Sequence, residues 1–150
     1  MKGHPHDHKD EQSQTKLAFS ATLHCLLGCG IGEVVGIIIG TAFLMTTINT
    51  LILAISLGFV FGFILGLRPL LRAGFNFKKA FRIVIIAEGL SIVVMEATEV
   101  LVQVYTPGVM EAGLASWIFW AGMLLAMTAG FIAAYPVNYF LIGKGIRHTH

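Results

Sequence analysis

Charged side chains are scarce in this chain of 150 residues, because Lys, Arg, Asp and Glu together make up only 12% of it. Soluble domains carry about 25%. Hydrophobic residues make up 56% of the chain, which is more apolar surface than one water-soluble core of this length can bury. This composition argues against a disordered protein, a nucleic-acid-binding protein and an ordinary cytosolic enzyme. We therefore expect an integral membrane protein.

Cysteine is also scarce. The two cysteines, Cys25 and Cys29, lie four positions apart and cannot form the disulfide framework of a small secreted domain. The sequence lacks a Ser/His/Asp set, a phosphate-binding glycine loop and a metalloprotease helix. It therefore predicts a protein that is not an enzyme.

Long apolar runs are abundant, and four of them cover residues 17–44, 48–67, 83–104 and 116–142. Each has the length of roughly 20 residues that crosses a hydrocarbon core. Because backbone groups in lipid must be satisfied within the segment, each run predicts a helix. We predict an all-α bundle of four transmembrane helices at 17–142. A disordered, His-containing tail at 1–16 precedes it, and a C-terminal tail at 143–150 follows it.

Lys and Arg are concentrated on one side of this predicted bundle. Five of them lie between Arg68 and Arg82, whereas residues 45–47 and 105–115 contain none. The positive-inside rule then places both termini and the 68–82 segment in the cytoplasm, in an inner (plasma) membrane protein. Since the 68–82 segment mixes Phe with cations, we expect it to form a short amphipathic helix at the membrane interface.

The first predicted helix carries unusual polar groups. Cys25, Cys29 and Glu33 are spaced by four and fall on one stripe about 80° wide. His24 points about 100° away from Cys25, toward another helix, the headgroups or another subunit. The cysteines are explained equally well as small packing residues. A carboxylate near mid-membrane, as at Glu33, is harder to explain by packing.

Glycines form a second stripe on the same helix, at Gly28, Gly32, Gly36 and Gly40. Such a small-xxx-small series lets another helix approach closely. Because four short helices enclose little space, we expect a pathway between the subunits of a homo-oligomer, with this glycine face packing helices together.

The third predicted helix contains Glu88, Glu96 and Glu99 within about 80° of arc. An acidic group at the membrane centre costs about 2.5 kcal/mol or more. No Lys or Arg lies inside any predicted span, so protonation or a bound metal ion must neutralise these acids. We expect a functional role above all for Glu96, whereas Glu99 is expected nearer the outer surface.

Depth within the membrane divides the polar residues into two predicted layers. Counting about 1.5 Å per residue from the cytoplasmic ends puts one layer about 9 to 10 Å deep and the other about 21 to 22 Å deep. The shallower layer holds Cys25, Glu88 and Tyr135, and the deeper one holds Glu33, Glu96 and Met127. This alignment predicts a polar path through the bundle.

Ligand chemistry narrows the ion that such a path would take. Cys and Met favour Cu⁺, whereas mixed Cys, His and Glu sites suit Zn²⁺. The predicted metal ligands are Cys25, Cys29, Glu33, Glu88, Glu96, His24 and Met127. Histidines at both ends, His4, His6, His8, His148 and His150, are either solvated tails or cation-gathering segments.

Two short motifs carry a resemblance to a known family. The first is His24-Cys25-Leu26-Leu27-Gly28-Cys29, and the second is Tyr135-Pro136-Val137-Asn138-Tyr139. The chain resembles a family of small bacterial membrane proteins, a domain of unknown function with an HCxxGC-type first helix and a YPVNY-type last helix. The resemblance spans about residues 17–150 and implies a four-helix membrane fold, but it implies no activity.

The residues favour a small membrane metal-ion transporter or metal-binding protein, for Cu⁺ or a divalent ion such as Zn²⁺. One alternative is a membrane redox protein in which Cys25 and Cys29 cycle between dithiol and disulfide, although an i, i+4 pair on a helix fits a disulfide poorly. A third hypothesis is a structural accessory subunit of a larger membrane complex. The expected partners are the bilayer, a metal ion and further copies of the chain, with no nucleic acid.

Overall fold

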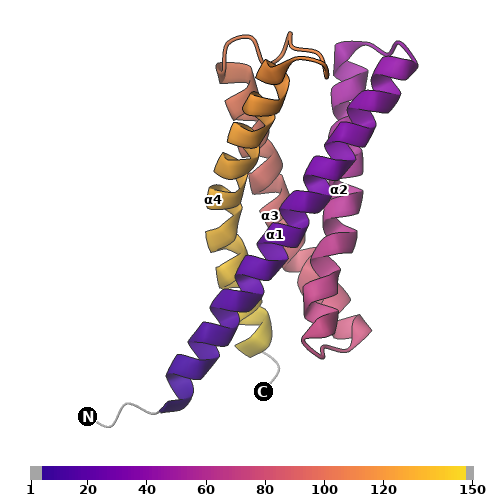
Figure 1. Ribbon diagram of the computed structural model, residues 1–150. Helices are drawn as coiled ribbons and strands as arrows, with labels where there is room; N and C mark the ends of the chain where they lie inside the picture. The colour runs from indigo at the N-terminus through magenta and orange to yellow at the C-terminus, as the bar shows by residue number, and fades with distance from the viewer. Residues whose placement is uncertain (1–4, 148–150) are drawn as a thin grey trace.

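The computed structural model describes residues 5–147 and consists of four α-helices (Figure 1). In chain order they are α1 (Pro5–Ala42), α2 (Thr47–Arg72), α3 (Phe77–Tyr105) and α4 (Trp117–Arg147). No strand occurs within this range. The prediction of an all-α fold with four helices is therefore confirmed. The side chains of the terminal histidines (His4, His6, His8, His148 and His150) lie outside the described part of the chain.

The outer helices are longer than predicted. α1 has 38 residues and begins at Pro5, so residues 5–16, which we expected to be disordered, continue the helix. Proline is tolerated there because it has no backbone N–H, and N–H groups in the first turn of a helix have no intrahelical acceptor in any case. α4 continues to Arg147 and takes in most of the expected C-terminal tail. Once an apolar run has nucleated a helix, each further residue adds a backbone hydrogen bond at little cost, so polar neighbours extend it.

The 68–82 segment differs from the prediction of a separate amphipathic helix. α2 continues through Pro69 to Arg72, and α3 begins at Phe77. Between them the backbone N–H of Phe75 donates to the Leu70 carbonyl over 3.2 Å. Gly74 adopts φ = +89°, the left-handed conformation that commonly ends a helix. The glycine therefore sets a tight reversal, and the cations are divided between two long helices.

The glycine stripe of α1 packs against α2 of the same chain. A Cβ added at Gly28 would lie 2.5 Å from the Phe61 carbonyl oxygen and 2.7 Å from the Gly62 Cα. Gly32, Gly36 and Gly40 meet the next three turns of α2 in the same way, at Leu57, Ala54 and Thr50. The predicted close approach of a helix is confirmed, but its partner is α2. The glycine face is therefore already covered, and a homo-oligomer would have to use another surface.

The four helices form two hairpins. α1 packs most extensively on α2, and α3 on α4, while the hairpins meet mainly through α1 with α4 and α2 with α3. Figure 1 shows the α1–α2 turn and the α3–α4 loop at one end of the molecule, which we call the loop end. At the opposite end, a buried apolar cluster drawn from all four helices closes the bundle. Its members are Ala18, Ala21, Leu70, Ala80, Ile83, Val84 and Ile142.

The surface is more apolar, and the interior holds more acidic groups, than in a typical soluble protein. Large apolar side chains such as Ile31, Ile64 and Leu124 are exposed, whereas four of the glutamates are buried. Three helices, α1, α2 and α4, are long and apolar enough to cross a membrane. α3 has 29 residues, about 44 Å of helix, but it carries three glutamates among its apolar residues and cations near its start. The prediction of a membrane protein is thus supported on three helices, and the crossing of α3 stays a prediction.

Candidate functional site

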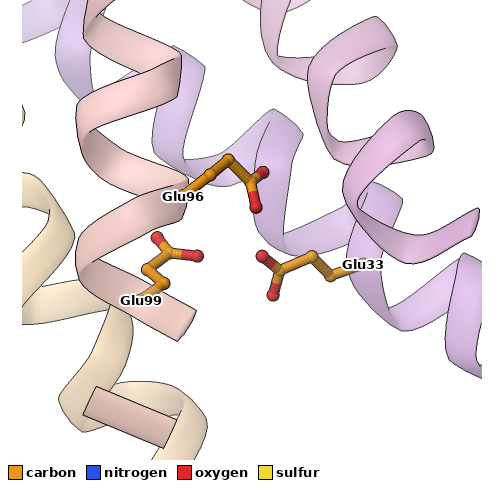
Figure 2. A group of neighbouring side chains, drawn as sticks. All are labelled: Glu33, Glu96 and Glu99. Carbon is orange, nitrogen blue, oxygen red and sulfur yellow. The ribbon is translucent and has the colours of Figure 1, made fainter. Parts of the chain in front are cut away.

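Three glutamates from two helices converge inside the bundle. Glu33 comes from α1, and Glu96 and Glu99 come from adjacent turns of α3 (Figure 2). One carboxylate oxygen from each lies within 4.8 Å of the others. Their exposed fractions are only 7%, 5% and 1%, respectively. We call these three residues the carboxylate cluster.

The carboxylate cluster has no compensating positive charge. Both oxygens of Glu96 and both of Glu99 lack a hydrogen-bond partner. The sequence contains no Lys or Arg between Lys16 and Arg68 or between Arg82 and Lys144. Isolated carboxylates in a low-dielectric interior are strongly unfavourable, so protons or a cation must balance them.

Open space leads from this cluster toward the loop end. A cavity of about 430 Å³ is lined by Glu33 together with residues of all four helices, the α1–α2 turn and the α3–α4 loop. Its polar lining includes Thr41, Thr50 and Gln103, while Ile37, Leu51 and Phe119 are among its apolar walls. Glu33 therefore connects the carboxylate cluster to a partly polar passage, which we call the loop-end cavity.

A second polar group lies closer to the termini. A Cβ built at Gly62 of α2 would be 2.7 Å from the Cys29 Sγ and 3.6 Å from the Cys25 Sγ. One turn further along α2, a Cβ at Gly66 would be 3.2 Å from Oε2 of Glu88. Cys25, Cys29 and Glu88 are all fully buried, and Cys25 and Glu88 are close enough to interact electrostatically. We call these three residues the thiol–carboxylate group.

The structure thus groups most of the predicted ligands in two neighbouring places, with Cys29 close enough to Glu96 to interact with it electrostatically. It brings Glu33 and Glu96 together and puts Cys25 beside Glu88, as counting the depth along the helices predicted. The carboxylate cluster also includes Glu99, which we expected nearer the surface. Glu99 joins because it lies one turn after Glu96 on the same face of α3.

Two predicted ligands lie outside both the carboxylate cluster and the thiol–carboxylate group. His24 is half-buried and its Nδ1 is 2.7 Å from the Ser20 carbonyl oxygen of its own helix. The Met127 methyl lies 2.8 Å from where a Cβ at Gly30 would be, so Met127 packs against another side of α1. The predicted layer of Glu33, Glu96 and Met127 therefore keeps only its two glutamates.

Sequence reasoning missed the role of α2. Its residues Ala54, Gly58, Gly62 and Gly66 are buried and recur every four positions. This stripe faces α1 on one side and leaves room for polar side chains on the other, since a Cβ at Gly58 would lie 2.7 Å from Oε1 of Glu96. The spacing was visible in the sequence and is the same signal that identified the glycine stripe of α1.

Comparison with known proteins agrees with this four-helix unit. A family model described as "Domain of unknown function (DUF4396)" matches residues 15–147. The chain belongs to the DUF4396 family. No curated protein and no solved structure matches this DUF4396 chain. The matched range contains both the carboxylate cluster and the thiol–carboxylate group, so both lie within the family's domain.

Proposed function

We propose that this DUF4396 protein binds a divalent metal cation at the carboxylate cluster and carries it across the membrane. The observation that supports the proposal is the convergence of three buried carboxyl groups, four of whose oxygens have no partner. A divalent cation placed among them would balance the charge that no Lys or Arg in the apolar segments can balance.

The ligand atoms favour a divalent ion over Cu⁺. Carboxylate oxygens suit Mn²⁺, Mg²⁺ and Ca²⁺ and are also found on Zn²⁺, whereas Cu⁺ prefers thiolate and thioether sulfur. Met127 is turned toward Gly30, and the cysteines lie beside Gly62, so no sulfur ligand joins the three carboxylates in the metal-sized cluster. Of the two metals predicted from the sequence, Zn²⁺ fits the carboxylate cluster better.

Proton exchange accompanies cation binding in this proposal. Without a metal, the carboxyl groups avoid mutual repulsion by holding protons. A cation that binds displaces these protons, because carboxylates bind metals in their ionised form. Metal movement would therefore be coupled to proton movement in the opposite direction.

The orientation that accompanies this proposal follows from the basic residues. We place all four helices across a plasma membrane, with both termini and the α2–α3 turn in the cytoplasm. The loop-end cavity then faces the other side, where a cation would enter and reach Glu33. The route requires that α3 cross the membrane with its glutamates facing the other helices and its apolar face toward lipid, because acids in transmembrane helices face the bundle interior.

Metal content of the purified protein tests the proposal. The protein in detergent is equilibrated with Zn²⁺, freed of unbound metal and analysed for metal per chain. We expect Glu33→Gln, Glu96→Gln and Glu99→Gln together to weaken binding by about 100-fold or more, since losing even an outer-shell partner costs about 10- to 100-fold. Glu111→Gln is the matched control, because Glu111 is exposed in the α3–α4 loop.

Uptake into proteoliposomes tests the transport step. Zn²⁺ entry driven by an opposing proton gradient is expected with the wild-type protein and with Glu111→Gln, and not with the triple variant. Unchanged metal content and uptake in the triple variant would refute the proposal. Such a result would favour the alternative, an accessory subunit in which these glutamates form contacts between helices.

A further inference from the structure

The thiol–carboxylate group has features that packing alone does not explain. Cys25 and Cys29 could fill space as small apolar residues. Glu88 cannot, because its side chain is fully buried and neither carboxylate oxygen has a hydrogen-bond partner. A buried carboxyl group without partners is costly, and this one faces a cysteine rather than a cation.

Two glycines of α2 leave space in which the sulfur and oxygen atoms of this group lie close together. Gly62 and Gly66 lack side chains on the side of α2 where both sulfurs and the Glu88 carboxylate lie. Ser91 lies one turn after Glu88 on α3, is fully buried, and its Oγ also lacks a hydrogen-bond partner. Two helices, α1 and α3, therefore supply two thiols and two unpartnered oxygen-bearing groups to the core, and α2 leaves space for the thiols and Glu88 at its glycines.

Equal spacing on two helices relates this group to the carboxylate cluster. Cys25 and Glu33 are eight residues apart on α1, and Glu88 and Glu96 are eight residues apart on α3. Eight residues span about 12 Å of helix. Both helices thus carry one polar layer at the carboxylate cluster and a second one about 12 Å closer to the termini.

We infer that Cys25, Cys29 and Glu88 form a second cation site, next to the carboxylate cluster, for a borderline or soft divalent ion such as Zn²⁺. Two thiolates and one carboxylate are a ligand set found on zinc, with a fourth position left for a hydroxyl or water. Binding releases the thiol protons and any proton on Glu88, and no electron transfer is involved. The inference extends the proposed function, since the second site lies further along the same polar core.

The enclosure of the second site distinguishes the two places. The loop-end cavity reaches Glu33 but is lined by neither cysteine, and the apolar cluster at the termini end closes the other side. A cation held by the thiols would therefore lie between the loop-end cavity and the apolar cluster, where an occluded site in a transporter would be.

Co²⁺ is a suitable probe, because thiolate ligation gives it a near-ultraviolet charge-transfer band that carboxylate ligation does not. The full-length protein in detergent is titrated with Co²⁺ and its absorption recorded. We expect a thiolate band with the wild-type protein, its complete loss with Cys25→Ser plus Cys29→Ser, and about tenfold weaker Co²⁺ binding with Glu88→Gln. Met95→Leu is the matched control, since Met95 is a fully buried sulfur residue of the same core cluster.

The carboxylate-cluster variant separates this inference from the proposed function. With Glu33, Glu96 and Glu99 all changed to Gln, the thiolate band is expected to persist. A wild-type protein that binds Co²⁺ without the band would overturn the second site and leave the first intact. A band that survives the double cysteine substitution, or that disappears in the triple glutamate variant, would likewise overturn a separate thiol site. Helical content by circular dichroism confirms that each variant is folded.

Discussion

The contact inside the α1–α2 hairpin and the contact between the two hairpins are built differently. Inside the hairpin, the backbones of two helices touch at glycines, with Gly28 against Gly62 as one example. Between the hairpins lie the buried glutamates, both cysteines and the loop-end cavity. One contact is closely packed at small residues, and the other holds buried carboxyl groups and is partly open.

We therefore expect the two contacts to have different roles. In lipid, helices associate through close packing of small residues, because no hydrophobic effect drives them together. The α1–α2 hairpin therefore behaves as one firmly packed unit. The contact between hairpins holds groups that are costly in lipid, and it is there that we propose a cation binds.

The largest effect on stability is expected from a substitution in the glycine contact. Gly28→Ala places a methyl group against the backbone of α2, which overpacks the contact by about 1–3 kcal/mol. Gly89→Ala is the control, because a Cβ there meets nothing within 4 Å and alanine favours the helix. Thermal unfolding in detergent measures both. If Gly28→Ala were as stable as Gly89→Ala, the hairpin would not depend on its glycines.

An intermediate effect is expected on the labelling rate of cysteines placed in the contact between hairpins, which measures how open that contact is to water. In a Cys25→Ser/Cys29→Ser background, a cysteine at Gln103 would line the loop-end cavity, whereas one at Ser91 would be fully buried. We expect a small, water-soluble thiol reagent to label Gln103→Cys at least about tenfold faster, because the reactive thiolate needs solvent access. Equal labelling rates would show that the cavity does not admit water.

Protection of Gln103→Cys by metal refines the same measurement. Zn²⁺ bound at the carboxylate cluster would occupy the floor of the cavity and slow labelling there. Adding Glu33→Gln to this variant is expected to remove the protection while leaving the metal-free labelling rate unchanged.

The smallest expected effect concerns a hydrogen bond that joins the hairpins. The Asn138 side-chain amide of α4 donates to the Thr22 hydroxyl of α1 over 2.9 Å, and both residues are fully buried. Hydrogen bonds between membrane helices contribute about 0.6 kcal/mol on average. A double-mutant cycle with Asn138→Ala and Thr22→Val is expected to give a coupling near that size. A coupling of zero would show that this hydrogen bond does not stabilise the contact between the hairpins.

Helix number, and the residues that stand out chemically, could be predicted from the sequence alone. Long apolar runs have few alternatives to helices, and glutamates far from any Lys or Arg are unusual in such runs. Helix ends were predicted less well, at Pro5 and around Gly74, because polar residues extend a helix that apolar residues have nucleated. Position along a helix also identified the pairs Glu33 with Glu96 and Cys25 with Glu88.

By itself, then, the sequence determined an apolar four-helix chain with acids and thiols at two depths, because depth follows directly from the rise per residue. Only the tertiary structure decided that the glycine face belongs to α2, that Glu99 joins the carboxylate cluster, and that Met127 turns elsewhere. Those outcomes depend on the rotation of each helix about its axis and on the choice of neighbour. Both are set by how the side chains of all four helices pack together, which no single segment specifies.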